Sequence, residues 1–263
     1  MIKFSIIVVS LNTKDKLENT IRSIIKQSSK NYEIIVVDGK SDDKTIDIIS
    51  KYKKYLKKII IKKDRGIYFA MNRGIKLASN NWLIFLNSGD TFFSIHTLKK
   101  ISSYLRKNKA VDVLVGNSKI IKQNIMYIKK FKKLSSDSLV SCFSHQSCII
   151  RTSLHKKNLF QTKYKIASDF NFFKQVFIKK AEFFYINETI SVNEAEGLSD
   201  KKRFLALREF KNINKLNESI NFKFIKYFFL NLYFVINYFL KLFIPLFLQR
   251  KILKLKLIFN RFV

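Results

Sequence analysis

The sequence contains almost none of the residues that form linkers. It has 1 proline and 6 glycines among 263 residues, whereas flexible and low-complexity segments are usually rich in proline, glycine or serine. This scarcity argues against long linkers between separate domains. A chain of this length can bury a full hydrophobic core. We therefore expect one main domain followed by a short tail.

Cysteine is nearly absent, which limits redox chemistry and metal binding. Cys142 and Cys148 have neither the spacing of a metal site nor a second pair of cysteines beside them. Two isolated cysteines fit a reducing compartment, where they usually pack as small apolar side chains. The apolar run at residues 4–9 is too short for the hydrophobic region of a secretory signal. We expect the protein to remain in the cytosol or on the inner face of its membrane.

Acidic residues are scarce too, since 19 Asp and Glu stand against 51 Lys and Arg and give a formal net charge of +32. Such a charge normally indicates a nucleic-acid or anionic-membrane partner. However, lysine, isoleucine, asparagine and phenylalanine are all abundant, and a coding bias toward these residues would account for much of the charge. The charge alone is therefore weak support for a partner, and we predict no nucleic-acid binding.

Short apolar runs alternate with amphipathic segments through the first half of the chain. The runs are expected strands, and they cover residues 4–9, 33–37, 59–61, 82–86 and 111–115. Between them, apolar residues recur at helical spacing from Leu17, Ile46, Met71 and Leu98. Strands that alternate with helices in this way predict an α/β fold with a mostly parallel sheet covered by helices.

Carboxylates follow two of the predicted strands. Asp38 comes directly after the second strand, and Asn87-Ser-Gly-Asp90 follows the fourth. Open α/β sheets bind ligands at the carboxyl ends of their strands, where Asp38 could accept a hydrogen bond from a base or ribose. The same turn fits equally well as a plain turn in which Ser41 or Asp43 caps the next helix. No G-x-G-x-x-G follows the first strand and no G-x-x-x-x-G-K-[ST] occurs, so a dinucleotide site or P-loop lacks its phosphate cradle.

Four motifs, in order along the chain, resemble the family 2 glycosyltransferases. They are Ser5-Ile-Ile-Val-Val-Ser-Leu-Asn12, Asp38-Gly-x-Ser-x-Asp-x-Thr45, Gly66-Ile-Tyr-x-Ala-Met-Asn-x-Gly74 and Leu86-Asn-Ser-Gly-Asp90. The resemblance extends over about residues 3–200 and is specific because the motifs occur together. It is strongest to the bacterial branch that builds capsule, colanic-acid and lipopolysaccharide sugars. It implies the GT-A fold, with a Rossmann-like mostly parallel sheet, and an inverting transfer of a sugar from a nucleotide donor.

The resemblance implies a nucleotide pocket in the first half of the chain. Asp38 would contact the nucleotide base with Asn12 beside it, and the pair Asp64 and Arg73 would shape the pocket. Phe69 departs from the family pattern, because an aspartate is usual at that position. A UDP-sugar is the donor that we favour.

The resemblance also implies a metal site at Asp90, the last residue of the family's acidic motif. Asn87 occupies the first acidic position of that motif and is expected to face the nucleotide sugar. With one carboxylate at this turn, donor phosphates and waters must supply most of the ligands. This arrangement suits Mg²⁺ or Mn²⁺ and predicts weak metal binding without the donor.

A second group of motifs implies the acceptor side. Ser144-His145-Gln146-Ser147 precedes a short apolar run, and Ala167-Ser-Asp169 opens a segment with phenylalanines at helical spacing. By resemblance, Asp169 is the base that deprotonates the acceptor hydroxyl, with Ser168 in place of a Glu that many relatives carry. A simple helix cap at Asp169 is the alternative. His145 and Gln146 are implied on the acceptor or phosphate side, although a lone histidine is usually structural.

The stretch Glu194-Ala-Glu196-Gly197-Leu198-Ser199 resembles the family's Gly-Gly-x-Ser loop, which covers the donor pyrophosphate. Gly197 and Ser199 are therefore implied on the phosphate side, with Glu196 in place of the first glycine. The basic run that follows, Lys201, Lys202 and Arg203, is expected to be a solvated surface rather than a phosphate site.

The end of the chain changes character, because residues 222–262 are rich in Phe, Leu and Ile and carry more basic than acidic residues. Residues 227–248 are long enough to cross a bilayer, which takes about 20 apolar residues. Lys241 at the bilayer centre would cost up to about 3 kcal/mol, and the polar residues of this segment share one helical stripe. We therefore predict a helix lying on an anionic membrane surface. A helical pair packed on the main domain or on a dimer partner is the alternative.

These inferences divide the chain into a nucleotide-sugar and metal half at 1–118, an acceptor half at 119–200, and a membrane-docking extension at 201–263. We predict a peripheral enzyme on the cytoplasmic face of a bacterial inner membrane. It would transfer a sugar to a lipid-linked, lipopolysaccharide or capsule saccharide.

Two other classes of protein stay open. A nucleotidyltransferase would need a phosphate loop rich in Gly, Lys or Arg after the first strand, and residues 10–15 are not such a loop. A non-catalytic saccharide-binding or scaffold protein is supported by Phe69 and Ser168, which replace common acidic residues. Release of a nucleoside diphosphate would distinguish the glycosyltransferase from both.

Overall fold

The computed structural model describes residues 1–122, 125–195, 202–214, 232 and 235–236. Two predictions therefore fall outside the described residues. One is the phosphate-side role of Gly197 and Ser199, and the other is the membrane-docking helix, of which almost nothing is described. Within the described ranges, no helix combines the length and the apolar character that a bilayer crossing requires.

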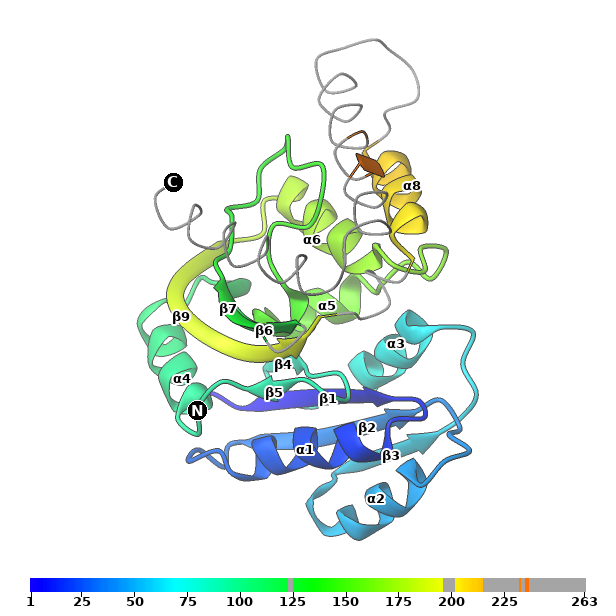
Figure 1. Ribbon diagram of the computed structural model, residues 1–263. Helices are drawn as coiled ribbons and strands as arrows, with labels where there is room; N and C mark the ends of the chain where they lie inside the picture. The colour runs from blue at the N-terminus through cyan, green and yellow to red at the C-terminus, as the bar shows by residue number, and fades with distance from the viewer. Residues whose placement is uncertain (123–124, 196–201, 215–231, 233–234, 237–263) are drawn as a thin grey trace.

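One sheet runs through the described part of the chain (Figure 1), in the strand order β3-β2-β1-β4-β8-β6-β9-β5 with β7 paired to β6. The strands are β1 (Phe4–Ser10), β2 (Tyr32–Asp38), β3 (Lys58–Ile61), β4 (Trp82–Phe85), β5 (Thr91–Phe92), β6 (Val113–Lys122), β7 (Ile125–Lys129), β8 (Cys148–Arg151) and β9 (Phe183–Glu194). The five strands predicted for the first half are all present, and the last of them continues to Lys122.

The first half of the sheet is parallel, as the alternation of strands and helices predicts. β1 pairs in parallel with β2 and β4, and β2 pairs in parallel with β3. β8 then runs antiparallel to both β4 and β6, while β9 is parallel to β6. Because Trp82 lies opposite Arg151 and Leu83 opposite Ile150, the start of β8 lies beside the end of β4. This reversal brings the second half of the chain to the ligand-binding edge.

Helices cover both faces of the sheet. α1 (Lys14–Ile25), α2 (Thr45–Lys51) and α4 (Thr97–Lys107) pack on one face, and α3 (Ile67–Leu77), α5 (Thr152–Lys157) and α6 (Ser168–Ile178) pack on the other. Figure 1 shows α1 and α2 below the sheet and α3 and α6 above it. The other helices that the structure describes are two short 3-10 helices, η1 (Lys53–Tyr55) and η2 (His145–Ser147), and α8 (Arg203–Ile213).

The side chains of β1 alternate between two hydrophobic cores. Ile6 and Val8 belong to the core under α1, α2 and α4, whereas Ile7 and Val9 belong to the core under α3, α5 and α6. Both faces of the strand are buried, which explains why its sequence is apolar at consecutive positions. Because burial of both faces produces continuous apolar runs, such strands can be predicted from the sequence.

Helix α3 approaches β1 closely at Gly74. A Cβ atom at this position would lie 2.5 Å from Cγ2 of Ile7, closer than real Cβ contacts. Any larger residue would push the helix away from the strand. The last glycine of the third motif is therefore explained by helix–sheet packing, and this packing holds Tyr68, at the start of α3, near the carboxyl end of β1.

Candidate active site

The turn after β4 places Asp90 in a buried position at the carboxyl edge of the sheet. The Ser88 amide donates to the carbonyl of Val9 at 3.0 Å, which fixes the turn to the end of β1. Gly89 has a φ of +103°, a conformation that favours glycine. Asp90 is 7% exposed. Burial raises its pKa to about 6, against the opposing effects of a hydrogen bond from Gln146 and of the nearby His145.

The atoms around Asp90 fit a divalent metal ion. The backbone N–H of Asn87 and the side-chain amide of Gln146 both donate to Oδ2 of Asp90, at 3.2 and 3.1 Å. The side-chain oxygens of Asn87 and Asn193 are buried without a hydrogen-bond partner. One carboxylate with neutral oxygens nearby is a ligand set for Mg²⁺ or Mn²⁺ completed by substrate phosphates and waters. In the described part of the chain, no group of three or more His, Cys, Asp or Glu residues could hold a metal by itself.

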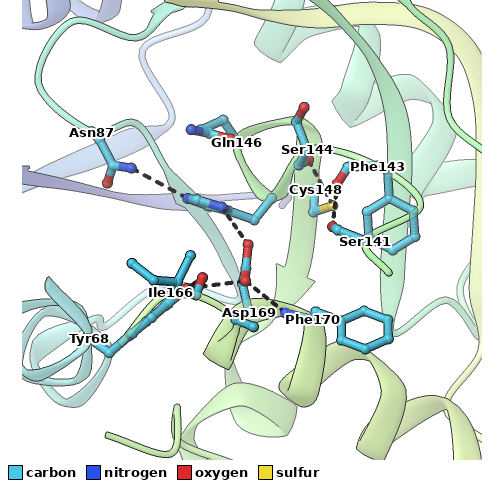
Figure 2. Close-up of polar contacts among 12 residues, drawn as sticks. Tyr68, Asn87, Ser141, Phe143, Ser144, Gln146, Cys148, Ile166, Asp169 and Phe170 are labelled. Atoms are coloured by element: carbon cyan, nitrogen blue, oxygen red, sulfur yellow. Dashed lines mark hydrogen bonds and ion pairs between the residues drawn. The ribbon is translucent and has the colours of Figure 1, made fainter. Parts of the chain in front are cut away.

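Asp169 lies in the first turn of α6 and is the centre of a hydrogen-bond network (Figure 2). Its Oδ2 is 3.0 Å from Nδ1 of His145, and its Oδ1 accepts from the Phe170 amide at 2.8 Å and the Tyr68 hydroxyl at 3.1 Å. Burial alone would raise the pKa of Asp169, but the interactions with His145, Phe170 and Tyr68 outweigh it and hold the pKa below the usual value. The carboxylate is therefore ionised at neutral pH.

The network goes beyond what a helix cap requires. The N-cap position of α6 is Ala167 rather than Asp169. Among the contacts of Asp169 just described, only the hydrogen bond from the Phe170 amide resembles helix capping. The contacts with His145 and Tyr68 come from η2 and α3, which are distant in sequence. Burial also raises the pKa of Tyr68 well above its usual value, so its hydroxyl stays protonated and can donate.

The short helix η2 connects the two carboxylates. His145 contacts Asp169, and its other ring nitrogen lies 3.4 Å from the side-chain nitrogen of Asn87. The next residue, Gln146, donates to Asp90 at 3.1 Å and accepts from the Asn193 side chain at 3.3 Å. If Nδ1–H of His145 donates to Asp169, Nε2 can accept from the Asn87 side chain.

A pocket of about 560 Å³ opens over this network. Asp169, His145, Gln146, Tyr68 and Asn87 are among its lining residues. Further lining residues come from β6, β7 and α8, namely Ile120, Lys122, Tyr127, Lys129, Arg203, Ala206, Leu207 and Phe210, and others come from the segments 140–144, 165–166 and 193–195. The pocket is therefore lined mainly by residues that the sequence assigns to the acceptor half, together with α8.

Asp38 and Asn12, predicted for the nucleotide base, are brought together at the ends of β1 and β2. Asp38 is fully buried, and its carboxylate accepts from the Ser10 hydroxyl and from the amide and hydroxyl of Ser41, each at 2.7 Å. The Asn12 amide donates to the Ser41 hydroxyl at 2.9 Å. Asp43 accepts from the first amide of α2, at Thr45, as the helix-cap alternative predicts.

Asp64 and Arg73 form an ion pair that retains hydrogen-bonding capacity. Nη2 of Arg73 lies 3.1 Å from Oδ1 of Asp64. Even so, both oxygens of Asp64 and Nη1 of Arg73 are buried without a hydrogen-bond partner. Burial raises the pKa of Asp64, and the charge of Arg73 opposes this rise. Buried polar atoms without partners are costly, so this pair is suited to a polar ligand.

Two residues of the site were not identified from the sequence. Tyr68 lies inside the third motif, but the motif alone predicts no role for its side chain. Asn193 lies near the end of β9 and carries no local sequence pattern. Both reach the site through contacts between elements that are far apart in the chain.

Residues 5–181 match Glycosyl transferase family 2. The chain therefore belongs to this family and is a glycosyltransferase. The PGL/p-HBAD biosynthesis glycosyltransferase of Mycobacterium bovis strain BCG / Pasteur 1173P2 is 30% identical over 208 residues, which cover 75% of this chain and 79% of the relative.

Solved structures show the same fold. S. aureus TarS in complex with UDP-GlcNAc superposes with a TM-score of 0.67 at 22% identity, over 84% of this chain and 68% of that one. The mannosyltransferase PcManGT from Pyrobaculum calidifontis, in complex with GDP-Man and Mn2+, gives a TM-score of 0.65 at 14% identity, over 84% and 66%. The predicted GT-A fold and the predicted enzyme class are confirmed. The capsule or lipopolysaccharide branch stays a prediction.

Proposed function

We propose that this glycosyltransferase moves a sugar from a nucleotide-diphosphate donor to a saccharide hydroxyl, with inversion at the anomeric carbon and Asp169 as the base. The observation that supports this most is the environment of Asp169. Asp169 lines the pocket, and its carboxylate is ionised and held on both oxygens by side chains from η2 and α3. A residue that only capped α6 would not need these contacts.

The donor is proposed to be a nucleotide sugar, with UDP as the favoured nucleotide. TarS and PcManGT, which share the fold, were solved with UDP-GlcNAc and with GDP-Man. By the motif resemblance, Asp38 and the pair Asp64 and Arg73 are the residues proposed to contact the nucleotide. The unpartnered atoms of Asp64 and Arg73 supply the hydrogen-bonding capacity that a base or ribose would satisfy.

A divalent cation, Mn²⁺ or Mg²⁺, is proposed to be held by Asp90 with the side-chain oxygen of Asn87 nearby. When bound, such a cation neutralises the charge that develops on the diphosphate as the sugar–phosphate bond breaks. Gln146 orients Asp90 by donating to Oδ2, and the Asp90 carboxylate would be the charged ligand of the cation.

The chemistry of this chain's own residues is then a proton transfer at Asp169. Its carboxylate takes the proton of the acceptor hydroxyl while that oxygen forms a bond to the anomeric carbon. The bond from the anomeric carbon to the phosphate oxygen breaks, and its electron pair leaves with the nucleoside diphosphate. Attack on the face opposite the leaving group inverts the anomeric centre. His145 and Tyr68 hold the carboxylate in place during this step.

The acceptor is proposed to be a lipid-linked, lipopolysaccharide or capsule saccharide at the cytoplasmic face of the membrane. This part rests on the apolar and basic composition of residues 222–262 and on the family resemblance. We expect a chain shortened to residues 1–221 to leave the membrane fraction of lysed cells. An unchanged membrane fraction would refute the docking proposal without touching the catalytic one.

The direct test measures nucleoside diphosphate released from a panel of UDP- and GDP-sugars, with and without Mn²⁺. We expect release by the wild-type protein and a fall of about 10²- to 10⁴-fold in the Asp169→Asn variant, which keeps the shape of the side chain but lacks a base. Release of pyrophosphate would instead indicate a nucleotidyltransferase. No release with any donor would support a non-catalytic role.

A further inference from the structure

Helix α8 lies beyond the family match at residues 5–181. One of its side chains nevertheless binds the loop at residues 165–167, which leads into Asp169. Glu209 is 5% exposed. Its carboxylate accepts from three consecutive backbone amides, those of Lys165 at 2.6 Å, Ile166 at 2.9 Å and Ala167 at 2.8 Å. An ionised carboxylate that accepts several amide hydrogen bonds forms a strong and directional contact.

The loop that Glu209 contacts ends two residues before Asp169, and it is also contacted by Tyr68 of α3. The Tyr68 hydroxyl lies 2.7 Å from the carbonyl oxygen of Ile166 and 3.1 Å from Oδ1 of Asp169. A tyrosine has one proton to donate, so the loop carbonyl and the carboxylate share it. A shift of Ile166 would therefore change the hydrogen bond that Asp169 receives (Figure 2).

Helix α8 is docked at further points, so Glu209 is presented from a fixed surface. Phe210 packs edge-on against Phe170, with ring centroids 5.2 Å apart. Asn214, just after the helix, donates to the carbonyl of Leu139 at 2.9 Å and also contacts the Lys174 ammonium. Ala206 and Ile213 are buried as well.

We propose that Glu209 is a positioning residue for Asp169. It fixes the three amides before α6, and through them and Tyr68 it sets where the Asp169 carboxylate points. The proposal rests on the proposed role of Asp169 as the base. It assigns a catalytic contribution to a helix outside the matched family domain.

Glu209→Gln tests this with little change in size. The glutamine keeps one acceptor oxygen, but its NH₂ group would face a backbone N–H and could not accept from it. The matched control is Glu33→Gln. Glu33 also accepts from a backbone amide, that of Ser79 at 2.7 Å, and from the hydroxyls of Ser5 and Ser79. It lies near the start of β2, at the opposite end of that strand from the ligand-binding edge.

The activity readout is release of UDP from UDP-GlcNAc, or from the best donor of the panel, in Mn²⁺. We expect Glu209→Gln to lower kcat by about 10- to 100-fold, because a displacement of about 1 Å at a catalytic group costs that much. The donor KM should stay within about twofold, because Glu209 does not touch the donor pocket. Glu33→Gln should lower thermal stability and leave kcat within about twofold.

A second readout does not need activity. The chain has only 3 histidines, so ¹⁵N spectra of the labelled rings can be assigned with three single variants. The His145 ring nitrogens report on the contact with Asp169. We expect their chemical shifts to change in Glu209→Gln and to remain as in wild type in Glu33→Gln.

Unchanged kcat and unchanged His145 shifts in a folded Glu209→Gln would overturn the proposal and leave Glu209 as a structural cap. If no donor yields any release with the wild-type protein, the proposed function fails, while the His145 shifts still test the positioning of Asp169. Should Glu209→Gln fail to fold, Glu209→Asp keeps the charge on a shorter stem. We then expect an intermediate kcat with an altered His145 spectrum, and wild-type values for both would count against the proposal.

Discussion

His145 and Asp169, 24 residues apart in sequence, form a side-chain pair in which Nδ1 of the imidazole lies 3.0 Å from Oδ2 of the carboxylate. The residue after His145 contacts the other carboxylate of the site, because Gln146 donates to Asp90 at 3.1 Å. One turn of backbone therefore fixes the distance between the proposed base and the proposed metal ligand. A disturbance of η2 should affect donor binding and proton transfer together.

Removal of the imidazole should move the pH dependence of the reaction. In His145→Ala, Asp169 loses a partner that lowers its pKa. Burial, which raises the pKa, is then opposed less, so the pKa of Asp169 should be higher than in wild type. Because the base must be ionised, activity rises with pH through the pKa of Asp169. We therefore expect the acid limb of the kcat/KM profile to move to higher pH. His96→Ala is the control, since His96 is exposed and its ring contacts only Ser28 among the contacts described. An unmoved acid limb in His145→Ala would count against the pair.

The close approach at Gly74 predicts a packing defect. In Gly74→Ala the new Cβ would lie 2.5 Å from Cγ2 of Ile7, and both residues are buried. Overpacking of this kind costs about 1–3 kcal/mol, which urea denaturation can measure. Ile7→Ala creates space at the same place, so the double variant should lose less stability than the sum of the two single variants. If the stability changes of the two single variants simply added in the double variant, the side chains at positions 7 and 74 would not be in steric conflict.

Strands β1, β2 and β4 were predictable because they are largely buried on both faces and therefore form continuous apolar runs, and β3 was predictable from three consecutive isoleucines. Strand β9 was not predicted, although it is 12 residues long, and its pairing with β6 shifts register on both sides of Asn117. Strand β5 has two residues, too few to carry a pattern. The sequence thus identifies strands that form continuous apolar runs, even short ones such as β3 and β4, and misses strands whose pairing depends on their neighbours.

The site divides in the same way. Asp38, Asp90 and Asp169 follow recognisable motifs, so their positions at element ends could be predicted. The contact of Glu209 with residues 165–167 spans more than 40 positions and leaves no periodic pattern. Likewise, the unpartnered oxygens of Asp64 become apparent only when the surrounding chain is in place.

Asp90 should cost the protein stability when no metal is bound. Its folded pKa of about 6 lies above the usual value of 3.8 because burial disfavours the charged carboxylate. As pH rises from about 4 to 6, the folded state must release a proton that the unfolded state has already lost, so stability falls. Asp90→Asn should therefore stabilise the metal-free protein at pH 7, by up to roughly 3 kcal/mol. Thermal denaturation in EDTA measures this gain, while Mn²⁺-dependent release of nucleoside diphosphate should be lost. A lower melting temperature for Asp90→Asn would contradict the prediction.

The titration of His155 should change the stability of the protein in the opposite direction to that of Asp90, over nearly the same pH range. It is fully buried and stacks on Phe172, with centroids 4.0 Å apart. Burial lowers its pKa from 6.5 to about 4. As pH falls through this window, the unfolded state takes up a proton before the folded state does, so stability is lost. His155→Phe should remove this loss, which amounts to roughly 3 kcal/mol at most.

The free energy of unfolding of the wild-type protein should therefore vary less with pH than either residue alone would make it vary. As pH falls from about 6 to 4, the titration of Asp90 raises the stability and that of His155 lowers it. Urea denaturation of both single variants across this range separates the two effects. Asp90→Asn should lose stability more steeply than wild type on acidification, since only the His155 effect remains. His155→Phe should lose it less steeply. Parallel curves for the two variants would show that neither group titrates in this window. If only one effect is missing, the variant at that residue should follow the wild-type curve.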